Sequence, residues 1–96
     1  MRLSKKEIQT ILQVAKEIYG NGVEVYLFGS RVNDEKKGGD IDLLIRSSSA
    51  PKGILARVRM LARLKYLLGE QKIDIIGDHE DSLVVREALN TGIRLV

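Results

Sequence analysis

The chain contains no cysteine and no tryptophan, and its only aromatic residues are three tyrosines and one phenylalanine. Without cysteine the protein has no disulfide bond, no zinc–thiolate site and no thiol nucleophile. The scarcity of aromatic side chains also argues against a base-stacking platform for single-stranded nucleic acid. Carboxylates, hydroxyls and basic side chains are therefore the groups on which any chemistry has to depend.

Long apolar runs are absent as well. No run approaches the roughly 20 residues that a membrane-spanning helix needs, and residues 1–9 lack the apolar core of a signal peptide. We therefore expect a cytoplasmic protein with no membrane partner, and 96 residues suit one domain over 1–96. The net charge of +3 and the pI near 9.3 are compatible with phosphate-bearing ligands, but they are too mild to favour DNA binding.

Apolar periodicity predicts an alternation of helices and strands. Ser4 and Glu7 have capping-box spacing and precede a helically spaced apolar series. The expected elements, in chain order, are a helix ending before Gly20, strands over 23–28 and 40–46, a helix from Pro51 to Leu68, a strand over 72–76, a helix capped by Asp81 or Ser82, and a short edge strand over 93–96. This order predicts an α/β (α+β) fold, with a mixed sheet of three to four strands and helices packed on one face.

Three aspartates lie on the predicted strands. Asp40 and Asp42 are two positions apart, so both side chains project from one face, with Cα atoms about 6.6 Å apart. Asp74 has the same parity relative to its apolar neighbours, so the three carboxylates share the open face if the apolar faces pack on the helices. A divalent cation reverses the sign of their mutual repulsion. Because Mg²⁺ takes carboxylate and phosphate oxygens, we predict a metal site suited to phosphoryl displacement.

Gly29-Ser30 ends the first predicted strand. Glycine allows a ligand to approach the backbone closely, and N–H groups of the following turn, with the Ser30 hydroxyl, can hold phosphate oxygens. Arg31 follows directly, and Arg46 and Lys72 share the face of the aspartates, so all three are candidates for neutralising phosphate charge. The simpler interpretation of these basic residues is ordinary surface charge, just as the aspartates taken alone are compatible with solvated strand residues.

The combination of Leu27-Phe28-Gly29-Ser30 with Asp40-Ile41-Asp42 resembles the motif of the nucleotidyltransferase superfamily related to DNA polymerase β, in its minimal form, the MNT domain. The order of elements through Ile76 is similar too. The resemblance implies transfer of a nucleoside monophosphate from an NTP, with ATP the expected donor, to a hydroxyl of a protein or RNA, with Mg²⁺ or Mn²⁺ as cofactor. It implies that Asp40 and Asp42 bind the metal. Asp74 is implied either to bind the metal or to help deprotonate the acceptor.

Many MNT proteins are antitoxins encoded beside a helical HEPN protein, which they neutralise, in some cases by nucleotidylating it. The resemblance therefore implies a HEPN-like partner, and one hypothesis is that the transferase activity requires that partner. A homo-oligomer is also compatible with so short a chain. Two alternatives stay open: an antitoxin that acts by contact with a vestigial metal site, and a nucleotide sensor without turnover. The spacer over 33–37 lacks the arginine-rich run that antitoxin-like members often carry.

The basic residues of the helix over 51–68 are expected to form its solvated side, with an RNA-binding stripe as the alternative. The tyrosines are expected to pack with their hydroxyls in water; they are Tyr19, Tyr26 and Tyr66.

Overall fold

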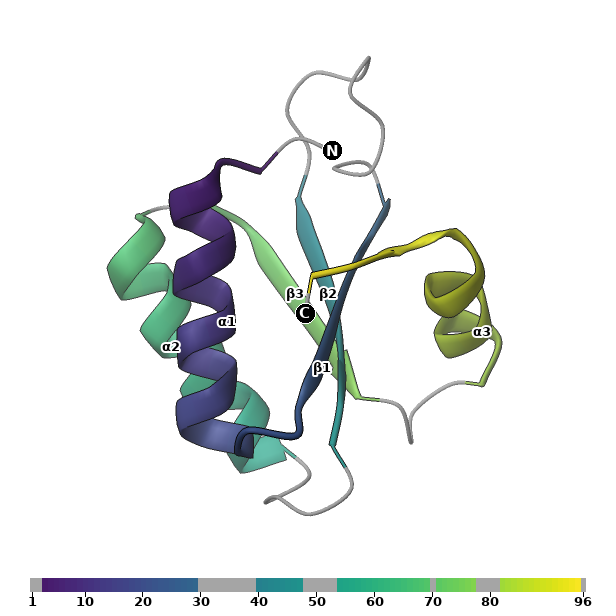
Figure 1. Ribbon diagram of the computed structural model, residues 1–96, viewed down its shortest axis with the longest axis horizontal. Helices are drawn as coiled ribbons and strands as arrows, with labels where there is room; N and C mark the ends of the chain where they lie inside the picture. The colour runs from purple at the N-terminus through teal and green to yellow at the C-terminus, as the bar shows by residue number, and fades with distance from the viewer. Residues whose placement is uncertain (1–2, 30–39, 48–53, 70, 78–81, 96) are drawn as a thin grey trace.

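The computed structural model describes residues 3–29, 40–47, 54–69, 71–77 and 82–95 of the chain (Figure 1). Its elements are α1 (Lys5–Tyr19), β1 (Glu24–Phe28), β2 (Ile41–Arg46), α2 (Ile54–Leu68), β3 (Ile73–Gly77), α3 (Ser82–Thr91) and β4 (Ile93–Arg94). This order confirms the predicted α+β class, and the ends of the strands differ from prediction by one or two residues. Within the described ranges, no helix is long and apolar enough to cross a membrane.

The four strands form one mixed sheet in the order β3-β2-β1-β4. β1 runs antiparallel to both β2 and β4, whereas β2 and β3 are parallel. The end of β1 therefore meets the beginnings of β2 and β3 at the same end of the sheet (Figure 1). In this register Asp42 lies opposite Phe28 on one side and Asp74 on the other.

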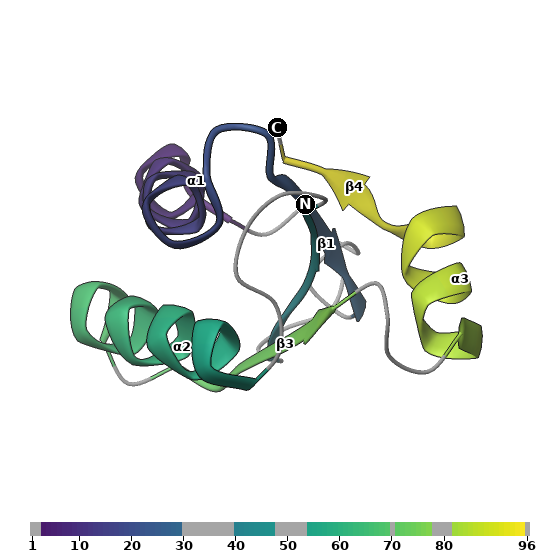
Figure 2. The same cartoon turned by 90° about the horizontal axis from the view of Figure 1, so that it is seen from below.

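The main core lies between one face of the sheet and the helices α1 and α2, which are adjacent on that face (Figure 2). α1 begins with the predicted capping box, in which the Glu7 N–H donates to Ser4 Oγ at 3.1 Å and the Ser4 N–H donates to Glu7 Oε1 at 2.9 Å. The strands contribute their alternate apolar residues to this core, as period-2 geometry requires. These are Val25, Leu27, Ile41, Leu43, Ile45, Ile73 and Ile75.

α3 packs on the opposite face of the sheet, so the prediction that all helices cover one face is wrong (Figures 1 and 2). A second, smaller apolar cluster forms there around Leu44, Val85 and Ala88. Leu44 interrupts the alternation of β2, and its side chain is fully buried on this face. A large apolar side chain pointing away from α1 and α2 needs a cover of its own, which α3 provides.

α2 turns a different side toward the core than its larger apolar residues suggest. Ala56, Met60 and Leu64 are buried, whereas Ile54 and Val58 are exposed. The prediction that Tyr66 packs against the protein is also wrong, because its side chain is largely in solvent. Small Ala56 and flexible Met60 allow α2 to approach the sheet and α1 closely on this side.

Candidate metal and nucleotide site

Asp40, Asp42 and Asp74 converge at the end of the sheet where β1 ends and β2 and β3 begin. One carboxylate oxygen from each residue lies within 4.8 Å of the other two. The parallel register places Asp74 directly beside Asp42, and the two-residue spacing along β2 places Asp40 on the same face. Asp40 and Asp42 are half-buried and Asp74 is exposed. The cluster offers oxygen ligands only, which is the donor set that hard divalent cations select.

Charge accumulates at this cluster. The pKa of Asp42 is raised above its usual range, first by partial burial and then by the negative charges of Asp74 and Asp40, with a hydrogen bond to Asp74 adding to the effect. Lys72 opposes these effects on Asp42, and its Nζ lies 3.6 Å from Asp40 Oδ2. Among the described residues, the charge of Lys72 does not balance the three carboxylates, so this part of the site favours the arrival of further positive charge.

Gly29 brings the backbone of β1 against the carboxylate of Asp42. Its φ of +77° lies in the left-handed region, which glycine adopts without the steric penalty that other residues incur. A Cβ atom at this position would also collide with Asp42 Oδ2. Both constraints require glycine, and they allow the end of β1 to lie directly against the Asp42 carboxylate.

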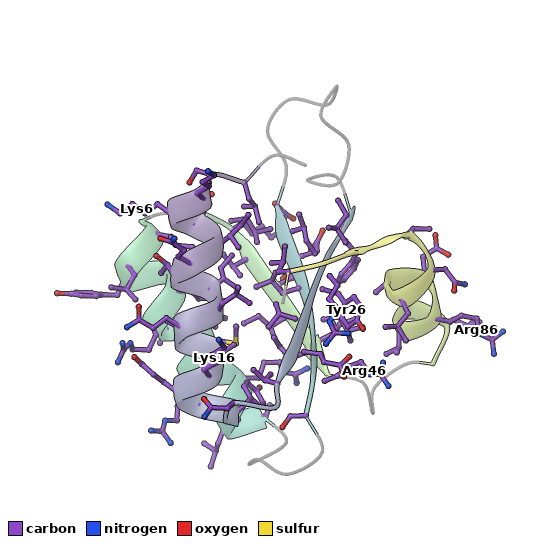
Figure 3. All side chains as sticks on the ribbon, in the orientation of Figure 1. Lys6, Lys16, Tyr26, Arg46 and Arg86 are labelled. Carbon is purple, nitrogen blue, oxygen red and sulfur yellow. The ribbon has the colours of Figure 1, made fainter. Side chains whose placement is uncertain are left out.

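The other predicted phosphate-binding residues are not gathered at the cluster. Ser30 and Arg31 lie outside the described residues. Arg46 is four residues from Asp42, or about 13 Å along β2, and its guanidinium lies 3.7 Å from Glu24 Oε1. The Tyr26 hydroxyl donates to the same oxygen at 2.9 Å, and Figure 3 shows Tyr26 and Arg46 close together between the sheet and α3. A role for Arg46 in binding phosphate stays a prediction. Of the predicted basic residues, Lys72 is the one that the described structure places at the cluster.

Phe28 is a neighbour of the site that the sequence alone did not single out. It is the cross-strand partner of Asp42, and its half-buried ring packs on the small cluster under α3. The ring therefore forms part of an apolar wall on the β1 side of the aspartates. Its parity was evident in the sequence, but the register that places it opposite Asp42 was not.

The fold and the motif agree with comparisons to known proteins. Residues 8–94 match the family model described as a nucleotidyltransferase domain, and no curated protein gives a significant match. A solved mutant of the MntA–HpeT toxin–antitoxin pair is 15% identical with a TM-score of 0.76, covering 93% of this chain and 71% of that one. The Shewanella oneidensis complex of a tri-AMPylated HEPN toxin with an MNT antitoxin is 17% identical, with a TM-score of 0.76 and coverages of 98% and 72%. Such identities establish a shared fold, and the family match over nearly the whole chain goes further: the chain belongs to the nucleotidyltransferase domain family.

Proposed function

We propose that this chain is a metal-dependent nucleotidyltransferase that moves a nucleoside monophosphate from a nucleoside triphosphate, with ATP the expected donor, to a hydroxyl of a protein or RNA. The observation that carries the proposal is the approach of Asp40, Asp42 and Asp74 to within 4.8 Å of one another beside Gly29. Family membership supports the same class of reaction.

The carboxylate cluster fits Mg²⁺ or Mn²⁺, because it presents only oxygen ligands and an excess of negative charge. Asp40, which directly precedes β2, and Asp42 on β2 would hold such an ion, and Asp74 on β3 would either complete the ligand set or take up the acceptor proton. When bound, the ion supplies Lewis-acid stabilisation of charge on the phosphate oxygens. Lys72 Nζ, now 3.6 Å from Asp40, is near enough to the cluster to contact a triphosphate held there.

The transfer forms a bond between the acceptor oxygen and the α-phosphorus of the triphosphate. The bond from that phosphorus to the bridging oxygen breaks, and pyrophosphate leaves with the electron pair. The acceptor proton passes to a carboxylate, for which Asp74 is the candidate because it is the most exposed of the three.

We further propose that the partner and acceptor is a HEPN-like helical protein, which this chain neutralises as an antitoxin. Support comes from the two structural neighbours, both toxin–antitoxin complexes, of which one contains an AMPylated HEPN toxin. The alternative is neutralisation by contact alone. The other neighbour is a toxin–antitoxin structure that carries aspartate-to-glutamate substitutions two positions apart, the spacing of Asp40 and Asp42, so a substituted pair of this kind still gives a structure of the complex.

The deciding experiment incubates the purified chain with Mg²⁺, α-labelled ATP and any helical protein that an adjacent reading frame encodes. Label on that protein supports transfer, and Asp42→Asn should reduce the labelling rate at least about a hundredfold. Glu24→Gln, on the same face but distant from the cluster, is the matched control and should label normally. If Asp42→Asn still neutralises the partner in cells, contact alone accounts for neutralisation; if the wild type neither binds nor transfers nucleotide at millimolar Mg²⁺ and ATP, the transferase proposal fails.

A further inference from the structure

The outward side of α2 carries an unusual row of exposed apolar side chains. Leu55, Val58 and Tyr66 have exposed fractions of 76%, 54% and 87%, and Ala62 between them is also exposed. Their spacing of three or four residues places them on one side of the helix. The core-facing side is formed separately by Ala56, Met60 and Leu64, so this second apolar row, which we call the outer row, is not part of the core among the residues that the structure describes. An outer row of this kind indicates an interaction site.

On α2 itself, the charged residues that border the outer row are all positive. Arg59 and Arg63 fall on one of its flanks and Lys65 on the other, and the helix contains no aspartate or glutamate over 54–68. Arg63 pairs with Glu17 of α1 at 3.1 Å, which leaves Arg59 and Lys65 as the exposed cations that border the outer row without belonging to that pair. The chemistry of the surface is therefore an apolar strip between two cationic edges.

We propose that the outer row is a docking site for an acidic amphipathic helix of another protein. A helix that lays an apolar stripe on Leu55, Val58 and Tyr66 brings its own flanking residues beside Arg59 and Lys65. Glutamates at those flanks form the complementary pairs that set partner choice in packed helices. Tyr66 contributes a large, rigid contact surface of the kind that dominates interface energies.

Charge and shape disfavour the other occupants. Two copies of this chain meeting through α2 would set arginine and lysine against arginine and lysine, whichever way the helices run. RNA is held by cations and stacking aromatics, whereas the centre of this surface is aliphatic apart from Tyr66. A helix that lies in a membrane presents a broad apolar face, whereas this strip is narrow and bounded by cations on both sides.

The proposed docking site is separate from the carboxylate cluster. α2 covers the face of the sheet opposite to the one from which Asp42 and Asp74 project, and Figure 2 shows α2 and α3 on opposite sides of the strands. A protein bound to the outer row therefore leaves the aspartates accessible. The inference does not depend on transferase activity and stands or falls on its own test.

The test uses the whole chain and two synthetic helical peptides of about three heptads. Both carry the same leucine and alanine stripe, but one has glutamate and the other lysine at the flanking positions. Fluorescence anisotropy should show that the glutamate peptide binds at least about tenfold more tightly than the lysine peptide, with a preference that weakens as salt is added. Arg59→Glu with Lys65→Glu should reverse the preference.

Variants of the outer row complete the test. Leu55→Gln with Tyr66→Gln should weaken binding of the glutamate peptide at least about tenfold. Because both side chains are exposed, the thermal unfolding midpoint of this variant should change little. Leu83→Gln, an exposed leucine on α3, is the matched control and should bind as the wild type does. Asp42→Asn should also bind normally, which distinguishes this inference from the proposed transfer reaction.

Several results would overturn the inference. One is equal binding, or none, for the two peptides. A second is a dimer in sedimentation velocity that disappears in the Leu55 and Tyr66 variant, since the outer row would then be a self-interface. A third is tighter binding of the outer row to single-stranded RNA or to phosphatidylglycerol vesicles than to the glutamate peptide, because either would assign the surface to a different class of ligand.

Discussion

Replacing Asp42 by asparagine should stabilise the metal-free protein while abolishing its response to Mg²⁺. Asp42 lies between Asp40 and Asp74, and burial and like charge raise its pKa above the usual range. Only the folded state brings the three carboxylates together, so their mutual repulsion acts against the folded state alone. An amide of nearly the same shape removes the repulsion without leaving a cavity.

The size of the effect follows from the distance. Two unit charges at 4.8 Å, the upper limit of the distances among these oxygens, repel by roughly 0.9 kcal/mol in water and roughly 3.5 kcal/mol at an effective dielectric constant of 20. Because solvent surrounds the half-buried Asp42 and the exposed Asp74, the repulsion energy should be close to the lower value. Attraction between Lys72 and Asp42 offsets part of this repulsion. We therefore expect a gain of about 1 kcal/mol, which raises the unfolding midpoint of a domain of this size by about 4–8 °C.

The pH dependence has a definite sign. A carboxyl whose folded pKa exceeds its unfolded pKa favours the folded state when protonated, and that contribution is lost as pH rises through the folded value. The advantage of Asp42→Asn over the wild type should therefore be largest above the raised pKa of Asp42 and should shrink as the pH falls through it. Molar NaCl should also reduce it, because salt screens partly exposed charges.

Urea unfolding at pH 7 in EDTA, and again in Mg²⁺, measures both parts of the prediction. A ligand at ten times its dissociation constant stabilises the folded state by about 1.4 kcal/mol. Mg²⁺ should therefore raise the unfolding free energy of the wild type to that of Asp42→Asn or above it. Glu24→Gln is the control, because that carboxylate accepts from Tyr26 and pairs with Arg46, and its loss should destabilise slightly. A variant less stable than the wild type in EDTA, or equal stabilisation of both by Mg²⁺, would refute the reasoning.

Three further substitutions test the turn beside the aspartates, the main core and the start of α1. Gly29→Ala should destabilise by at least about 1–2 kcal/mol from its positive φ alone, and because the new Cβ displaces the Asp42 carboxylate, the thermal shift induced by Mg²⁺ should fall with it. Leu64→Ala, in the core between α2 and the sheet, should cost about 2–5 kcal/mol in urea unfolding. Ser4→Ala removes one half of the capping box and should cost about 1 kcal/mol, with loss of far-UV helical signal on heating at a lower temperature.

Local sequence signals predicted the helices and strands, whereas packing between distant segments determined which faces of the sheet and of the helices are buried. The capping box at Ser4 and the glycine at position 20 mark α1 because both act within one helical turn. The prediction failed at α3, although Leu44 carried the relevant signal: an apolar residue on the polar side of β2 implies a second covered face. α2 was ambiguous for a different reason. It has apolar residues on both sides, so periodicity did not reveal which side faces the core.

The candidate site shows the same division. The spacing of Asp40 and Asp42 fixes their common face through strand geometry alone, but the distance to Asp74 depends on the register of β2 and β3. Parity placed Arg46 on that face too, and it is four residues further along β2, where it pairs with Glu24. The parity of a residue therefore predicts which face of the sheet its side chain occupies, and its position along the strand determines whether it lies at the site. Counting about 3.3 Å per residue would have separated Arg46 from the aspartates without any structure.

The arrangement of the two faces explains how the protein tolerates an unfavourable cluster of charge. Among the described residues, fifteen buried side chains form the core under α1 and α2, and three form the one under α3. Most of the hydrophobic stabilisation therefore lies across the sheet from the aspartates, so repulsion at the cluster lowers stability without disrupting the core that holds β2 and β3 in register. The parallel pairing of β2 with β3 holds Asp42 beside Asp74. A substitution at either aspartate should accordingly change charge and metal binding while the sheet beneath it persists.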